Sequence, residues 1–163
     1  PRGFSVISLL DNTVLSNFAV IQRPDLLRTA FEENLATPQQ AFDELQAGIR
    51  AGKLPPDLDW QWLPVWTLSD TEILHYQKFL QRLNAGEAAC LAIALVRNCR
   101  VLTDDRDARE FARRLRIPLS GTLGVLARLL DIECLAPDEG DRLLRAMIAA
   151  GYRSPVHSLQ DII

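Results

Sequence analysis

Apolar residues in this chain form two alternating patterns: short continuous runs, and longer stretches with apolar positions three or four residues apart. The continuous runs predict buried strands, and the spaced stretches predict helices that bury one face. The predicted strands lie at residues 4–10, 34–37, 63–68, 100–103 and 117–120. The predicted helices lie at residues 13–19, from 24 onwards, and at 38–51, 69–83, 87–96, 106–115, 122–130 and 137–150. This alternation is typical of an α/β domain whose parallel sheet is covered by helices on both faces.

Helix-capping residues refine three of these boundaries. Thr37 is expected to be the N-cap of the helix that runs to about Ala51, with Pro38 at its first helical position. Ser69 and Glu72 have the spacing of a capping box, and Glu87 follows Asn84 at the same spacing.

Composition indicates a single domain spanning residues 1–163. The chain is 48% hydrophobic, which suits a domain that buries roughly 70% of its unfolded surface. Its three cysteines are odd in number and lack CxxC spacing, which argues against a disulfide framework or a zinc site. Without a charged-then-apolar leader or an apolar run of membrane length, we expect a cytoplasmic protein with no membrane partner.

Charge is unevenly distributed along the chain. The net charge of −3 weighs against a nucleic-acid partner, yet the 106–116 segment carries five arginines against two acids. Arg106, Arg109 and Arg113 have helical spacing that puts them on one face, and arginine suits bidentate contact with phosphate. They are the candidate RNA-binding residues. One alternative is an ordinary solvated helix face. Others are that these arginines pair with Glu110 or bind a protein partner.

Carboxylates gather where predicted strands end. Asp11 follows the first strand, Glu87 opens a helix, and a group of three follows the strand at 100–103, namely Asp104, Asp105 and Asp107. Each could simply cap or stabilise a helix start. Independent caps have no reason to meet at one edge of a parallel sheet, where such folds place their sites. Acids brought together there repel one another unless a cation lies among them, which predicts a hard-metal site.

Four motifs resemble those of PIN-domain nucleases. They are Leu10-Asp11-Asn12-Thr13-Val14-Leu15, the helix Thr37-Pro38-Gln39-Gln40-Ala41-Phe42-Asp43-Glu44-Leu45, Gly86-Glu87-Ala88, and Leu102-Thr103-Asp104-Asp105-Arg106-Asp107. Gly86-Glu87-Ala88, Gly121-Thr122-Leu123-Gly124 and the tail Gly151-Tyr152-Arg153-Ser154 resemble a bacterial and archaeal branch that looks like the toxins of toxin–antitoxin pairs. The motifs span residues 4–130 and leave 131–163 as a C-terminal helical extension.

This resemblance implies a three-layer α/β/α fold with a mainly parallel central sheet and a metal-dependent endoribonuclease activity. It implies that Mg²⁺ or Mn²⁺ is held by four acids, with RNA as substrate and an antitoxin protein as a further partner. The acids are Asp11, Glu44, Glu87 and Asp105, with Thr13, Thr103, Asp104 and Asp107 in supporting positions. The register of the last motif is open, and Asp105 is favoured because Thr103 then takes the family's threonine position.

Two other functional classes stay open. One is a catalytically silent PIN-like module that binds RNA or protein. The other is an unrelated nucleotide-binding α/β domain. The sequence argues against this class, because no Gly-x-Gly-x-x-Gly or phosphate loop follows the first strand. The RNA cleaved, the number of metals, the existence of an antitoxin and the oligomeric state, including a homodimer, are left undecided by the sequence.

Overall fold

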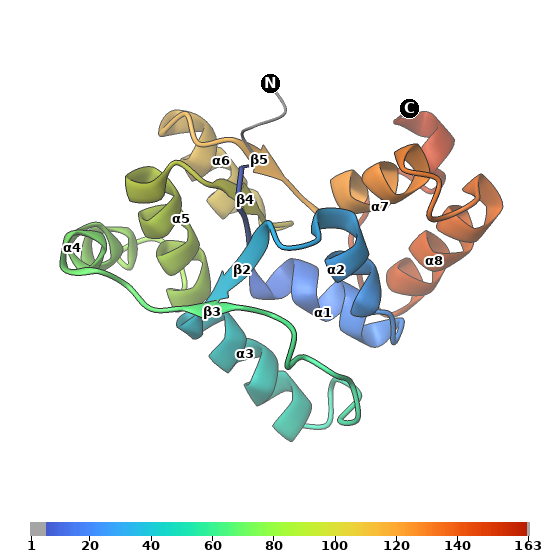
Figure 1. The fold of residues 1–163 in the computed structure, drawn as a ribbon, viewed down its shortest axis with the longest axis horizontal. Coiled ribbons are helices and arrows are strands. Elements are labelled where there is room, and N and C mark those ends of the chain that lie inside the picture. Colours follow the sequence, from blue (N-terminus) through green and yellow to red (C-terminus); the bar gives the residue numbers. More distant parts are fainter. Residues whose placement is uncertain (1–5, 163) are drawn as a thin grey trace.

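Five short parallel strands form the centre of the molecule (Figure 1). The computed structural model describes residues 6–162. The strands are β1 (Ser8–Leu10), β2 (Leu35–Pro38), β3 (Val65–Trp66), β4 (Arg100–Leu102) and β5 (Leu119–Ser120), in the order β3-β2-β1-β4-β5. Every adjacent pair is parallel. The predicted α/β class with a parallel sheet is therefore confirmed.

Alternate residues of the central strands point to opposite faces of the sheet and divide the core in two. Leu10, Leu35 and Leu102 belong to one buried cluster, whereas Leu9 and Val101 belong to the other. The first cluster is completed by α1 (Asn12–Val20), α2 (Asp25–Phe31), α7 (Thr122–Asp131) and α8 (Pro137–Ala149), and the second by α4 (Asp70–Phe79), α5 (Ala85–Arg97) and α6 (Arg106–Arg114). The result is the expected three-layer α/β/α arrangement, with these two helix groups on either side of the sheet in Figure 1.

Helix α3 (Gln39–Arg50) lies near the carboxyl end of β2 and bridges the two layers (Figure 1). Leu45 joins the core on the α1 side. The neighbouring Ala41 packs against the start of α5, where a Cβ added at Gly86 would lie 3.2 Å from Ala41 Cα. The C-terminal 3₁₀-helix η1 (Leu159–Asp161) also reaches the first cluster, through Leu159.

Several predicted boundaries differ from the structure, because tertiary pairing overrides local signals. The prediction that Thr37 caps α3 is wrong: Thr37 and Pro38 lie in β2, and α3 begins at Gln39. The Thr37 hydroxyl donates a 2.7 Å hydrogen bond to the carbonyl oxygen of Leu10 inside the sheet. Helix α5 starts at Ala85 rather than Glu87, α4 ends at Phe79 rather than Leu83, and β1, β3 and β5 are shorter than predicted. Residues 4 and 5 of the first predicted strand lie outside the described residues.

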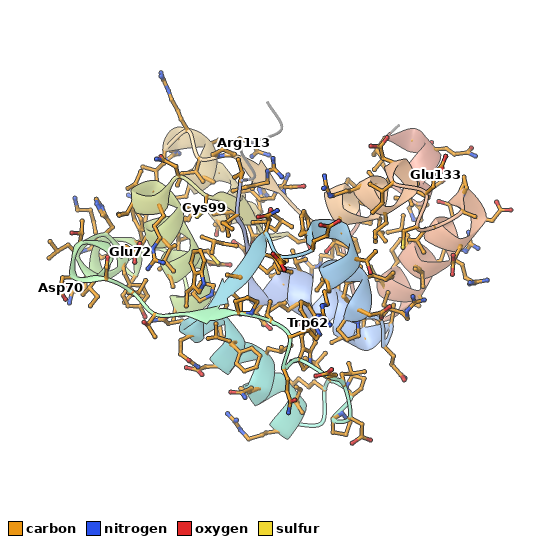
Figure 2. The ribbon with its side chains drawn as sticks, in the orientation of Figure 1. Trp62, Asp70, Glu72, Cys99, Arg113 and Glu133 are labelled. Carbon is orange, nitrogen blue, oxygen red and sulfur yellow. The ribbon has the colours of Figure 1, made fainter. Side chains whose placement is uncertain are left out.

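The capping box at Ser69 and Glu72 is present, and it anchors more than a helix end. Glu72, labelled in Figure 2, is fully buried, and both of its oxygens accept hydrogen bonds from Arg97, at 2.7 and 2.9 Å. Arg97 lies over the ring of Trp66, 4.8 Å from its centroid, so the edge strand β3 is tied to α4 and α5. Among residues 6–162, no helix is long and apolar enough to span a membrane.

The order of the strands determines where a site can form. From β1 the chain builds outward to β2 and β3, and then returns to add β4 and β5 on the other side of β1. Such a reversal leaves a crevice at the carboxyl ends of the two central strands. Leu10 of β1 is paired with Leu102 of β4, so the residues that follow them, Asp11 and Thr103, meet at this crevice.

Candidate functional site

Asp11 is buried at the centre of the crevice, with only 1% of its surface exposed. Its Oδ2 accepts hydrogen bonds from the hydroxyls of Thr103, at 2.9 Å, and Thr13, at 3.0 Å. Its Oδ1 is buried and has no hydrogen-bond partner among the described residues. Although Asp11 stands at the N-cap position of α1, its side chain makes no capping bond, so the capping explanation is wrong for this residue. Burial raises the pKa of Asp11 above its usual range.

The two threonines connect the loop after β1 with the loop after β4. Thr13 Oγ1 accepts a 2.9 Å hydrogen bond from the backbone N–H of Asp104, and Thr103 Oγ1 accepts one of 3.1 Å from that of Asp105. Because each hydroxyl also donates to Asp11, its single proton is committed to the carboxylate. Both threonines thus orient Asp11 and leave its second oxygen available.

Glu44 presents the other unpartnered oxygen of the site. It is half-buried on α3, and its Oε1 is buried without a hydrogen-bond partner in residues 6–162. Gly86 leaves room for this carboxylate, since a Cβ at that position would collide with Glu44 Oε1. Burial and the negative charge of Asp11 raise the pKa of Glu44 to about 7.

Glu87 belongs both to a helix cap and to the acidic site. With Asn84 it forms a complete capping box: Glu87 N donates to Asn84 Oδ1 at 2.9 Å, and Asn84 N donates to Glu87 Oε1 at 3.3 Å. Its side chain is only 5% exposed. The pKa of Glu87 is raised to about 8, mainly by burial and next by the negative charges of Asp11 and Asp105. A residue needed only for the cap would have no reason to lie among other carboxylates.

The structure gives different environments to the three aspartates after β4. Asp104 holds the start of α7, because its carboxylate accepts hydrogen bonds from Thr122 N, Thr122 Oγ1 and Asn17 Nδ2. Asp105 caps α6 by accepting from Ala108 N at 2.9 Å, and it faces the site, where it contributes to the raised pKa of Glu87. Asp107 is exposed and lines a separate small depression beside Glu110.

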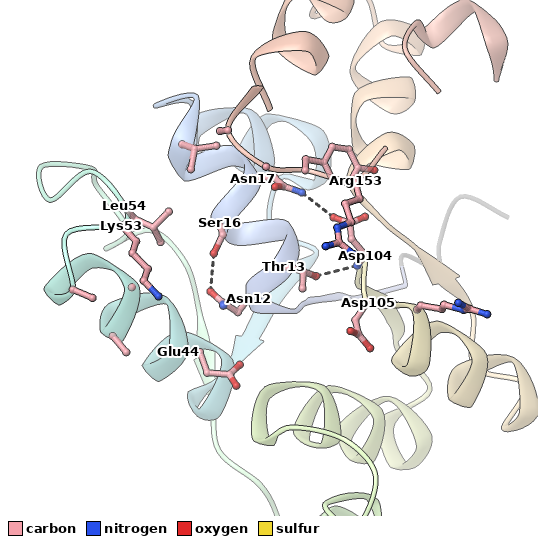
Figure 3. Close-up of a pocket in the computed structure, with 18 residues that line it drawn as sticks. Asn12, Thr13, Ser16, Asn17, Glu44, Lys53, Leu54, Asp104, Asp105 and Arg153 are labelled. Atoms are coloured by element: carbon pink, nitrogen blue, oxygen red, sulfur yellow. Dashed lines mark hydrogen bonds between the residues drawn. The ribbon is translucent and has the colours of Figure 1, made fainter. Parts of the chain in front are cut away.

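A cleft of about 1120 Å³ opens beside these groups: Thr13, Glu44, Asp104 and Asp105 line it, whereas Asp11 and Glu87 do not. Glu44 projects into it from α3, and Asp105 projects from the opposite wall, as Figure 3 shows. Side chains that the motif analysis did not single out also line it, including Asn12, Ser16 and Lys53. Ser16 and Asn12 are joined by a 2.9 Å hydrogen bond one helical turn apart. The sequence could have indicated both as site residues, because they lie on the helix that directly follows Asp11.

The donor set suits a hard divalent cation. The candidate ligands supply only carboxylate oxygens, which Mg²⁺ and Mn²⁺ prefer over nitrogen or sulfur. Two of the buried oxygens without partners, Asp11 Oδ1 and Glu44 Oε1, are carboxylate atoms that a bound cation would satisfy. Within residues 6–162, however, no group of three or more histidine, cysteine, aspartate or glutamate side chains stands ready to hold a metal ion.

Comparison with known protein families decides the classification of this fold. The model of the family DUF3368, described as a PIN domain, matches residues 7–163. The chain belongs to the PIN-domain family. Members of this family are generally nucleases and typically use divalent metals, so the unrelated nucleotide-binding domain is no longer an alternative.

The fold of this PIN domain is also found in a solved structure. The crystal structure of PAE2754 from Pyrobaculum aerophilum is similar with a TM-score of 0.56 and 17% sequence identity, over 77% of this chain and 90% of that one. At this identity the likeness concerns the fold alone. No protein in the set of curated proteins matches the chain.

The three candidate RNA-binding arginines of this PIN domain do not form one continuous stripe. Arg109 turns toward the sheet, where its Nη1 donates to the carbonyl oxygens of Thr103, at 2.8 Å, and Ser120, at 3.0 Å. Arg106 and Arg113 are exposed. Arg153 lies in the segment after α8, so helical spacing could not group it with these arginines. It lines the same cleft as Arg106.

Proposed function

We propose that this PIN domain is a metal-dependent endoribonuclease that hydrolyses phosphodiester bonds in RNA. The observation that carries the proposal is the pair of buried, unpartnered oxygens, Asp11 Oδ1 and Glu44 Oε1, at the carboxyl edge of a parallel sheet. Leaving such atoms unpaired costs folding free energy, and this cost is removed when a cation binds. Membership of a family that generally consists of nucleases supports the same reaction class.

Four acids would hold the Mg²⁺ or Mn²⁺ ion: Asp11, Glu44, Glu87 and Asp105. A bound cation of this type would supply activation of water for attack on phosphorus and stabilisation of the departing oxygen. Thr13 and Thr103 fix one oxygen of Asp11, so that the other faces the site. Glu44 and Glu87, with pKa values of about 7 and about 8, would release protons near neutral pH when a cation takes their place.

The experiment that tests this function compares the full chain with Asp11→Asn. Mn²⁺ or Mg²⁺ should raise the melting temperature of the original protein, because a ligand that binds only the folded state stabilises it by mass action. Asp11→Asn should lose cleavage of a labelled RNA and most of this metal response, while it gains stability in chelator because a buried charge is removed. The exposed Asp131, at the end of α7, provides the matched control Asp131→Asn. Identical melting curves in chelator and in saturating metal would rule out the site.

We further propose that the domain acts as the toxin of a toxin–antitoxin pair, with the antitoxin as its protein partner. This rests on the resemblance of Gly86-Glu87-Ala88 and Gly121-Thr122-Leu123-Gly124 to that branch. Induced expression of the chain should then arrest growth of a bacterial host, and Asp11→Asn should abolish the arrest. Unimpaired growth at comparable protein levels would reject the toxin role without bearing on the nuclease activity.

A further inference from the structure

A second cavity lies beside the cleft that contains Glu44 and Asp105, below called the acidic cleft. The lining of this second cavity is net positive, with four arginines and one carboxylate. This groove, of about 470 Å³, runs between α6 and the segment that follows α8. Arg106 and Arg113 line it from α6, and Arg153 lines it from the other wall. Arg106 and Arg153 also line the cleft that contains Glu44 and Asp105. The arginine groove and the acidic cleft therefore adjoin along these two side chains.

The groove keeps a net positive charge, because four arginines line it against one carboxylate, Asp104. In residues 6–162, Arg106, Arg113 and Arg153 take part in no ion pair, whereas Arg114 on the same helix is paired with Glu110 at 3.1 Å. The one carboxylate that lines the groove, Asp104, is committed to the start of α7.

Arg109 adds a fixed positive charge at the base of the groove. It is half-buried, and its Nη1 is held by two backbone carbonyls at the ends of β4 and β5. Its guanidinium is therefore immobilised, while those of Arg106, Arg113 and Arg153 have no fixed partner in the described part of the chain.

We infer that the arginine groove binds the phosphate backbone of the RNA on one side of the bond that is cut. This inference rests on the proposed nuclease function. Carboxylates alone repel a polyanion, so a strand that enters the acidic cleft needs cationic groups next to it. Arginine suits this role because its planar fork donates paired hydrogen bonds to phosphate oxygens. An acidic peptide would satisfy the same charges, but the continuity of the groove with the acidic cleft favours the strand that is to be hydrolysed.

The test measures RNA binding without hydrolysis. A short fluorescein-labelled single-stranded RNA of mixed sequence is titrated with the full chain in chelator, and fluorescence anisotropy is followed at several KCl concentrations. The double variant Arg113→Ala/Arg153→Ala should bind more weakly and should reduce the slope of log K against log salt by about 1.4, since each lost contact with a single strand removes about 0.7. The control is Arg114→Ala, which removes one positive charge, half of what the double variant removes, from α6 but outside the groove.

Three outcomes decide the inference. A reduced affinity and slope in the double variant, with unchanged values in Arg114→Ala and unchanged melting curves for both proteins, support it. A reduction in Arg114→Ala of half that in the double variant, or more, overturns it, because the effect would then follow net charge alone. Unchanged RNA binding also overturns it, and a simultaneous loss of binding to a polyglutamate peptide would assign the groove to an acidic partner. Because no step requires metal or cleavage, these results are independent of those obtained with Asp11→Asn.

Discussion

Thr103 donates a 2.9 Å hydrogen bond to Asp11 Oδ2 across 92 residues of sequence, and both side chains are buried. The same hydroxyl accepts a hydrogen bond from the backbone N–H of Asp105. One threonine thus orients one candidate ligand and positions the loop that carries another. The two central strands of the sheet are joined at the point where the site lies.

Replacing this threonine by valine should destabilise the protein. Thr103→Val keeps the shape of the side chain but leaves the N–H of Asp105 without its acceptor and Asp11 with one donor fewer. We expect the free energy of unfolding to fall by about 1–3 kcal/mol, measured by urea denaturation in chelator. Thr29→Val is the control, because the Thr29 hydroxyl donates to Asp25 O on the exposed side of α2. A loss no larger than that of the control would show that the buried bonds contribute little.

The two roles of Glu87 can be separated by substitution. Glu87→Gln keeps an oxygen for the capping box but removes the charge. It should therefore retain helix α5 and lose most of the rise in melting temperature produced by Mn²⁺. Asn84→Ala should do the opposite, with a loss of about 1 kcal/mol in stability and a retained metal response. A Glu87→Gln protein that responds fully to Mn²⁺ would remove Glu87 from the ligand set.

Stability in chelator should decrease as the pH rises. The pKa values of Glu44 and Glu87 are about 7 and about 8 in the folded protein, against 4.5 for an ordinary glutamate. Between about pH 4.5 and 8 the folded state therefore holds protons that the unfolded state has released, so the free energy of unfolding falls with pH. Urea denaturation across this range should show a shallower decline for Glu87→Gln. The raised pKa values would be contradicted if the free energy of unfolding of the original protein stayed flat or rose with pH, relative to that of Glu87→Gln.

The contact between α3 and α5 should not tolerate a side chain at Gly86. Gly86→Ala would place a methyl group against Glu44 Oε1 and 3.2 Å from Ala41 Cα. Because the backbone of Ala41 cannot yield cheaply, we expect a loss of about 1–3 kcal/mol and a weaker metal response. In Gly48→Ala the new methyl group meets only the flexible end of Leu54, at 3.0 Å, so this variant should be tolerated. Thermal melting with and without Mn²⁺ distinguishes the two.

Asp104 and Asp105 should differ in what they support. Asp104→Asn disturbs the carboxylate that holds Thr122 and Asn17, so it should lower stability by about 1–3 kcal/mol and keep the metal response. Asp105→Asn should reduce the metal response instead. Mn²⁺ titrations followed by calorimetry check both variants. The reverse pattern would exchange their roles.

The sequence by itself determined the order of the elements and much of the local chemistry. Continuous and spaced apolar runs identified all five strands, and the capping boxes at Ser69 and Asn84 form as their spacing predicted. These features could be predicted because hydrophobic period and capping depend on residues within a turn or two of one another. The carboxylates at strand ends were visible for the same reason.

Only the tertiary structure decided how those residues are used. Pairing of β1 with β4 buries Asp11 against Thr103, and packing of α3 on α5 brings Glu44 to Gly86. The packed sheet also commits the Thr37 hydroxyl to the carbonyl oxygen of Leu10 instead of to the predicted helix cap, and it turns Arg109 toward the sheet. Burial and the partners of a polar group depend on segments far apart in the chain. Local patterns could therefore identify the acids, but only the packed sheet determines which of their oxygens are left free.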